Sequence, residues 1–153
     1  YLEYPGYVLE HNFLRKAGVC VFVRADVCCR RLRGLEQRDL SLLWLRVDHG
    51  GRSRIYACLY RSHSSDAGSA LIEHVQEGTN RVLEQYPSAE VVVLGDFNAH
   101  HQEWLGSRTT DLPGRTAYDF ALAYGFSQLV TQPTRVPDIE GHEPSLLDLL
   151  LTT

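Results

Sequence analysis

Hydrophobic residues in this chain fall into short runs separated by polar residues, a pattern that predicts strands. The apolar positions alternate weakly in the first of these segments and are denser in the others, and Gly, Pro or polar residues bound each run. The predicted strands cover 19–24, 39–48, 53–61, 91–94, 126–131 and 146–153. The run Val91–Leu94 contains three β-branched residues, which indicates a strand buried on both faces. Two glycines within 49–52 separate two of the strand patterns and predict a hairpin.

Helical spacing appears in two places. Leu71, Val75, Val82 and Tyr86 form one apolar face over 66–86, with a candidate N-cap in Ser64-Ser65-Asp66 and a stop at Pro87-Ser88. A second helix is predicted over 114–124, ended by Gly125 as a left-handed cap, and a loop over 133–144. Hairpins combined with two helices favour a layered α/β domain.

The segment from Gly95 to His101 is the strongest candidate for chemistry. It follows the buried run directly and reads Gly-Asp-Phe-Asn-Ala-His-His. In extended backbone, positions i and i+2 point to one side, so Asp96 and Asn98 are expected to converge on a phosphate or a water. The glycine would allow a tight turn. The alternative is a polar turn in which both side chains bond their own backbone.

Two further residues stand out at the ends of apolar strands. Asp148 lies in a run of leucines, where a buried carboxylate would be costly without partners, or it is an ordinary edge residue facing the open end of the sheet. Tyr60 ends a strand whose inward residues are apolar, and by itself it is interpreted as a core aromatic with an exposed hydroxyl.

Length and charge restrict the possibilities. A chain of 153 residues is one domain at most and can bury ~70% of its unfolded surface. It contains no Met, so we expect a segment of a longer polyprotein, and no apolar run is long enough for a membrane span. A net charge of −4 argues against a protein that coats DNA non-specifically, but not against a nuclease.

Arginines and cysteines give weaker indications. A dense basic patch is either a DNA contact or a solvated loop, and it consists of Arg30, Arg31, Arg33 and Arg38. The four cysteines have no zinc spacing, and Cys20 and Cys58 lie in apolar strand patterns, where a free thiol acts as a small hydrophobe. A reducing, intracellular setting is expected.

The order of these motifs resembles the endonuclease/exonuclease/phosphatase superfamily, and within it the endonuclease domains of non-LTR (LINE-type) retrotransposons. The matching segments are Gly18–Arg24 as a Gly-rich early strand, Arg54–Ser62 as the strand ending in a catalytic Tyr, Gly95–His100 as the central motif, 113–120 with 132–135 as a segment typical of retrotransposon members, and Ser145–Leu149 as the late strand bearing Asp. The resemblance covers nearly the whole chain.

The resemblance implies a β-sandwich flanked by helices and hydrolysis of phosphodiesters. It assigns Asp96 to water activation, Asn98 to phosphate orientation and Tyr60 to a hydrogen bond with the scissile phosphate. Asp148 would hold a catalytic His through its ring N–H. Contacts to substrate phosphate are expected from Ser145, His100 and Arg61; of His100 and His101, one is expected to make loop contacts near the site and the other to face solvent.

The implied cofactor is Mg²⁺ (or Mn²⁺), and the implied partners are DNA, the element RNA and a reverse transcriptase domain of the same polyprotein, with no membrane. The intact domain would nick target DNA, in the nucleus, to prime reverse transcription. Two family elements lack a match: neither Glu3 nor Glu10 stands in the context of the metal-holding Glu, and no Ser-Asp-His element is present. We therefore expect a domain truncated at both ends and inactive by itself.

Two alternatives remain open: a phosphoesterase of the same fold acting on phospholipid or inositol phosphate, and a catalytically inactive remnant or binding module.

Overall fold

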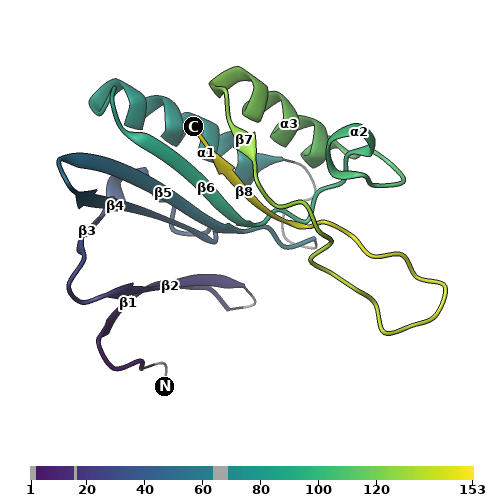
Figure 1. Cartoon of the computed structure of the whole chain (residues 1–153), viewed down its shortest axis with the longest axis horizontal. Coiled ribbons are helices and arrows are strands. Elements are labelled where there is room, and N and C mark those ends of the chain that lie inside the picture. The colour runs from purple at the N-terminus through teal and green to yellow at the C-terminus, as the bar shows by residue number, and fades with distance from the viewer. Residues whose placement is uncertain (1–2, 16, 64–68) are drawn as a thin grey trace.

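One six-stranded sheet organises the chain, with helices on one of its faces (Figure 1). The computed structural model describes residues 3–15, 17–63 and 69–153. The elements are β1 (Tyr7–Phe13), β2 (Gly18–Arg24), β3 (Cys28–Arg31), a short 3-10 helix (Arg33–Leu35), β4 (Leu42–His49), β5 (Arg52–Tyr60), α1 (Ala70–Gln85), β6 (Glu90–Asp96), α2 (Gln102–Leu105), α3 (Leu112–Tyr124), β7 (Ser127–Gln128) and β8 (Asp148–Thr152). The predicted α/β class is confirmed.

The strand order in the large sheet is β3-β4-β5-β6-β8-β7. β5 and β6 pair in parallel, and the other described pairs are antiparallel. The connection between β5 and β6 contains α1, which returns the chain to the end of the sheet where β5 begins (Figure 1). β5 and β6 therefore run in the same direction, and their C-terminal ends lie side by side. The hairpin β1–β2 forms a separate two-stranded sheet on the face away from α1 and α3.

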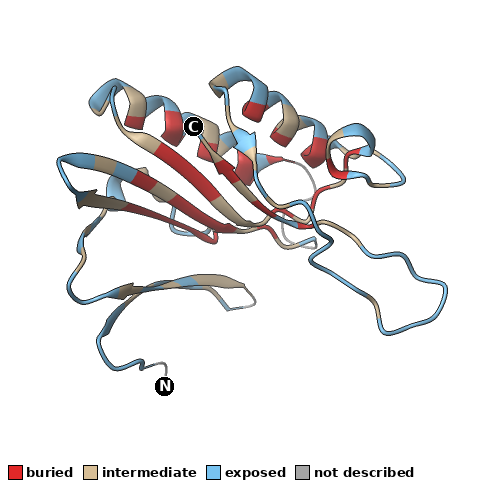
Figure 2. Cartoon of the chain, viewed as in Figure 1, coloured by how far each residue is buried: buried red, intermediate tan, exposed pale blue. Residues whose placement is uncertain are grey.

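The core lies between the large sheet and its helices. Figure 2 shows buried residues along the central strands and on the inner sides of α1 and α3. Trp44, Phe97 and Phe120 are the largest fully buried side chains. Gly78 of α1 lies so close to Trp44 that an added Cβ would be 2.6 Å from the indole ring, so this glycine lets helix and sheet approach.

The predicted hairpin at 49–52 is confirmed. β4 and β5 pair up to His49 and Arg52, and the two intervening residues, Gly50 and Gly51, have φ of 59° and 74°. Two consecutive left-handed residues match the twist of antiparallel strands, and glycine adopts that conformation without steric cost.

Both helices were predicted, with different starting points. α1 begins at Ala70 after Ser69, later than the predicted start at 66, and the candidate cap Ser64-Ser65-Asp66 lies outside the described residues. α3 begins at Leu112, two residues earlier than predicted, and ends as predicted at Gly125, which has φ of 68°. No helix in the described part of the chain is long and apolar enough to span a bilayer.

Other predictions were incomplete. The strand expected over 126–131 is reduced to Ser127–Gln128, because the next residues bond to the side chain of Gln128 or to β8 singly. The strands β1 and β3 and the one-turn helix α2 were missed. The apolar residues at the start of β1 are followed by Glu10, His11 and Asn12, and β3 is four residues long with two arginines, so neither shows the longer apolar run from which the other strands are inferred. Cys58 is buried, as expected for a small hydrophobe in an apolar strand, whereas Cys20 is exposed.

Candidate active site

Three of the predicted site residues lie side by side at the ends of adjacent strands in the large sheet. Tyr60 of β5 is the register partner of Asp96 of β6, and Asp96 is also the register partner of Asp148 of β8. Register partners in a sheet project to the same face. The preceding partners on the same strands, Leu59 and Leu149, belong to the core on the helix side, so the phenol and the two carboxylates project to the opposite face.

Gly95 makes this close arrangement possible. Its φ is 138°, and a Cβ added there would lie 1.9 Å from the carbonyl oxygen of Leu59 on the neighbouring strand. No side chain fits at this distance. The glycine expected to permit a tight turn therefore permits a close contact between β5 and β6, one residue before the first catalytic candidate.

The backbone turns sharply between Asp96 and Asn98. β6 ends at Asp96, and Asn98 has φ of 44°, in the left-handed region that Asn tolerates better than most residues. The Asn98 N–H donates to Oδ1 of Asp96 over 2.9 Å. The extended geometry expected for Asn98 is therefore wrong, and of the turn considered as the alternative the bond made by the Asp96 side chain is present. One carboxylate oxygen of Asp96 is occupied by this turn, and Oδ2 has no hydrogen bond in the part of the chain that the structure describes.

The electrostatic environment raises the pKa of Asp96 above its ordinary value. Burial is the largest cause and the negative charge of Asp148 is the second, while the Asn98 N–H bond and the positive charges of Arg135 and Arg61 act in the opposite direction. A carboxylate with a raised pKa is a stronger base than a free one, which suits proton abstraction.

A single hydroxyl fixes the start of β8. Oγ1 of Thr134 accepts hydrogen bonds from the backbone N–H groups of Leu147 and Asp148, at 3.2 and 3.0 Å. Arg135 and Ser145 form a backbone bridge next to it. Asp148 itself is exposed, so it faces the open end of the sheet and is not buried among leucines. The role of Thr134 was not foreseen, although its segment was noted in the resemblance.

The loop after the central motif is anchored by Asp111. Its Oδ1 accepts the N–H of His100 at 3.0 Å and, as the N-cap of α3, the N–H of Gly114 at 2.8 Å. A Cβ at Gly114 would lie 1.8 Å from the carbonyl oxygen of His100, so the helix and this loop are in direct contact. The cap was missed, but Asp followed two residues later by Pro is a recognisable start signal for a helix.

The two histidines differ from expectation. His101 is buried, its Nδ1 accepts the Trp104 N–H at 3.1 Å, and its ring packs against Tyr118 with 4.6 Å between centroids. His100 is half-buried. Neither histidine is classed as exposed, so the expectation that one would face solvent is wrong; the N-cap bond and aromatic packing hold His101 inside.

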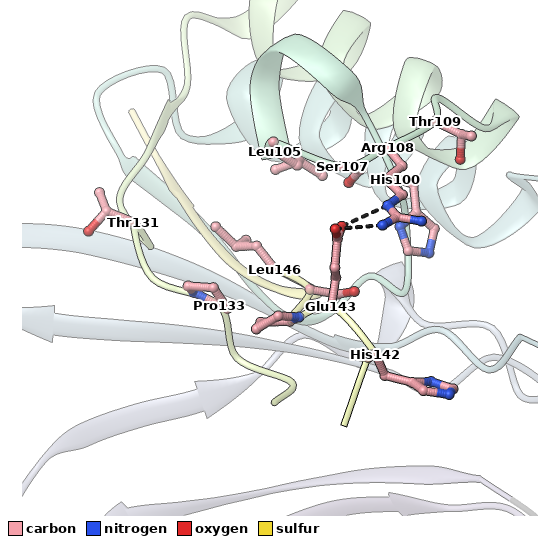
Figure 3. A pocket seen from close by; sticks show the side chains of 14 residues that line it. His100, Leu105, Ser107, Arg108, Thr109, Thr131, Pro133, His142, Glu143 and Leu146 are labelled. Atoms are coloured by element: carbon pink, nitrogen blue, oxygen red, sulfur yellow. Dashed lines mark hydrogen bonds and ion pairs between the residues drawn. The ribbon is translucent and has the colours of Figure 1, made fainter. Parts of the chain in front are cut away.

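A cavity of about 570 Å³ lies beside the strand ends, between the loop that contains α2 and the segment 131–146 (Figure 3). Its lining includes His100 and Ser145, which were predicted to contact substrate. Arg108 and Glu143 form an ion pair of 2.6 Å across it. Tyr60, Asp96 and Asp148 are not part of this lining.

Arg61, also predicted to contact phosphate, is only 3% exposed. Its Nη1 donates to the carbonyl oxygen of Asn98 over 2.9 Å. The arginines of the basic patch lie elsewhere, at β3 on the far edge of the sheet and in the segment after it. Arg31 is held there by Glu36 at 2.8 Å and Glu10 at 3.5 Å, so it stabilises the fold locally.

The described residues do not form a complete metal site by themselves. No group of three or more His, Cys, Asp or Glu side chains within 3–15, 17–63 and 69–153 is placed to hold an ion. Asp96 and Asp148 are adjacent carboxylates with the hard oxygen atoms that Mg²⁺ prefers, but two carboxylates are not a complete ligand set. Oxygen atoms of substrate or water would have to complete the coordination of an ion held by this pair.

Comparison with known proteins agrees with the motif order. The family model described as endonuclease-reverse transcriptase matches residues 55–153. The chain is 29% identical over 150 residues to the probable RNA-directed DNA polymerase from transposon BS of Drosophila melanogaster; the match covers 97% of the chain and 16% of that relative. The chain thus spans about one sixth of the length of this curated relative.

Solved structures share the fold. The endonuclease domain of TRAS1, a telomere-specific non-LTR retrotransposon, superposes with a TM-score of 0.73 at 16% identity, over 98% of this chain and 68% of that one. A truncated TDP2 from Caenorhabditis elegans gives a TM-score of 0.58 at 14% identity, over 96% of this chain and 61% of that one. The expected endonuclease/exonuclease/phosphatase fold is confirmed, and the match over most of its length shows that the chain belongs to the endonuclease-reverse transcriptase family.

Proposed function

We propose that this chain forms the core of a metal-dependent endonuclease domain that nicks DNA to prime reverse transcription of a non-LTR retrotransposon. The observation that carries the proposal is the lateral alignment of Tyr60, Asp96 and Asp148 at the ends of three adjacent strands. One phenol and two carboxylates on one face suit the hydrolysis of a phosphodiester, which needs a proton acceptor for water and a donor to the phosphate oxygens.

Each residue has a distinct role in this proposal. Asp96 accepts the proton of the attacking water through Oδ2, the oxygen not used in the turn with Asn98. The Asn98 amide and the Tyr60 hydroxyl donate to phosphate oxygens as charge develops there. Asp148, exposed at the start of β8, orients a general acid–base group through its carboxylate.

The cavity next to these strands gives room for the nucleotide that flanks the scissile phosphate. His100 and Ser145 line it and are proposed to contact the DNA backbone. A divalent cation, Mg²⁺ or Mn²⁺, would neutralise phosphate charge, with Asp148 among its ligands. The element RNA and a reverse transcriptase domain of the same polyprotein are the proposed partners, and the nucleus is the proposed place of action.

The proposal is tested by plasmid relaxation with the domain in its native flanking sequence. Asp96→Ala should lower the rate of Mg²⁺-dependent nicking by ~10²–10⁴-fold, because a general base is lost. Asp119→Ala is the matched control, since Asp119 is an exposed carboxylate on α3. Equal nicking by Asp96→Ala and wild type would refute the assignment. Hydrolysis of inositol phosphate or phospholipid without nicking would instead identify a phosphoesterase.

A further inference from the structure

Arg61 lies directly behind the site and is bonded to both ends of the Asp96–Asn98 turn. Its backbone N–H donates to the carbonyl oxygen of Asp96 over 2.8 Å, which extends the pairing of β5 and β6 one residue past Tyr60. Its Nη1 donates to the carbonyl oxygen of Asn98 over 2.9 Å. One residue therefore holds the first and the last member of the tripeptide.

Burial separates Arg61 from the substrate side. Successive residues of an extended chain point to opposite faces, so Arg61 projects away from the face on which Tyr60 lies. It is 3% exposed, whereas Arg135, the other arginine whose charge acts on Asp96, is exposed. A buried guanidinium needs hydrogen-bond acceptors within the protein, and the Asn98 carbonyl is one of them.

The turn needs such a restraint. Among the described residues other than glycine, Asn98 is the one with a positive φ. This conformation costs free energy, so it persists only where the surrounding structure enforces it. The charge-assisted bond from Arg61 to the Asn98 carbonyl orients the backbone of Asn98. The side chain of this residue is proposed to contact the phosphate.

We infer that Arg61 is a positioning residue, which holds the Asp96–Asn98 turn in its productive geometry from behind and does not contact the phosphate. This inference rests on the proposed function for its catalytic consequence, but not for its structural one. It departs from the role in phosphate binding that the resemblance implied for Arg61.

The structural consequence is measured by amide hydrogen exchange at Asn98, whose N–H is bonded to Asp96 in the turn. Arg61→Gln should speed this exchange by about tenfold, the equivalent of one lost hydrogen bond. Arg135→Gln removes an equal charge near Asp96 but leaves the backbone bridge to Ser145, so it should leave Asn98 exchange unchanged. Arg61→Lys keeps the charge with a different donor geometry, so an intermediate rate is expected. Wild-type exchange in either folded Arg61 variant would overturn the inference, and the lysine variant decides if the glutamine variant does not fold.

The catalytic consequence is measured by nicking kinetics of the domain in its native flanking sequence. Arg61→Gln should lower kcat by about 10²-fold with KM unchanged, because the reacting groups are displaced while DNA contacts remain. A raised KM with unchanged kcat, together with a salt dependence of binding shallower by about one phosphate contact, would show that Arg61 binds the DNA backbone and would overturn the inference. If wild type does not nick DNA, the proposed function fails, whereas the exchange at Asn98 still decides whether Arg61 holds the turn.

Discussion

Asp96 is subject to opposing electrostatic influences that determine how the site responds to pH. Burial and the nearby Asp148 disfavour its charged form, and the Asn98 N–H with two arginines favours it; the first pair is stronger, so the pKa of Asp96 is raised. For an acid whose pKa is higher in the folded state, ionisation weakens folding. The stabilising contribution is therefore complete below the unfolded pKa and lost as pH rises through the folded pKa.

Asp96→Asn should consequently raise the Tm at neutral pH, because the variant cannot ionise and its amide oxygen can still accept the Asn98 N–H. The gain should shrink as pH falls toward 3.8, the ordinary value for this carboxyl, where wild type is also protonated. Thermal unfolding followed by circular dichroism across this range checks the prediction, with Asp119→Asn as the exposed control. A Tm difference that does not vary with pH would contradict it.

Gly95 is the position where the smallest addition has the largest expected effect. Gly95→Ala would place a methyl group 1.9 Å from the Leu59 carbonyl oxygen at a φ of 138°. We expect a loss of ~4 kcal/mol or more in the free energy of unfolding, because backbone on both strands must move. Gly34→Ala is the control, since nothing lies within 4 Å of its added Cβ, and it should change stability by less than about 0.5 kcal/mol. Urea unfolding of the two variants compares them directly, and similar midpoints would contradict the close approach of β5 and β6.

At the scale of elements, α3 is connected to the site through its own N-cap. Asp111→Ala should cost ~1–2 kcal/mol of stability, because the Gly114 N–H loses its acceptor, and it should also release the loop that carries His100. Thr116→Ala in the same helix is the control, because its hydroxyl donates to the Leu112 carbonyl of its own helix at the surface. Chemical denaturation measures the cost, and amide exchange at His100 shows whether the loop is released. Equal effects of the two variants would argue against the connection.

The elements that the sequence predicted are those with an apolar signal of their own. The strands β4, β5, β6 and β8 each carry buried side chains, and α1 has a regular apolar face. The missed elements β1, β3 and α2 are short or rich in polar residues, so their signal is weaker. Their backbone hydrogen bonds are made with partners that local patterning does not identify.

The sequence named residues of the candidate site, but it did not predict how they are arranged. The resemblance identified Tyr60, Asp96 and Asp148, but their lateral register depends on the parallel crossover through α1, which no local pattern encodes. The burial of Arg61 and its bond to the Asn98 carbonyl result from contacts between segments far apart in the sequence. Such tertiary contacts are absent from any periodicity of the chain.

At the scale of the whole molecule, the two faces of the large sheet are covered differently. α1 and α3 cover one face, while the other faces β1–β2 (Figure 1). A mostly apolar hollow of about 770 Å³ is lined by residues of β2 and of the facing strands β4, β5 and β6. Cys58 on β5 lines this hollow and is 7% exposed. Burial raises the pKa of its thiol to about 12, so little reactive thiolate forms at neutral pH.

Thiol labelling tests how firmly the hairpin covers the sheet. A variant that retains only Cys58 should react with a disulfide reagent ~10³-fold or more slowly than one that retains only the exposed Cys28, because reaction requires opening of the fold. The reaction is followed by absorbance under native conditions, and denatured samples of both variants provide the control. Rapid labelling of Cys58 would show that β1–β2 leaves this face without unfolding of the core.

The alignment of three strand ends also means that the proposed activity depends on one hydrogen-bonding register. If β8 slipped by a single residue against β6, Leu147 or Leu149 would stand opposite Asp96, and the second carboxylate would turn toward the helices. Such a molecule would keep its secondary-structure content and lose its chemistry. Nicking would then monitor correct strand assembly more sensitively than any spectrum of the folded chain.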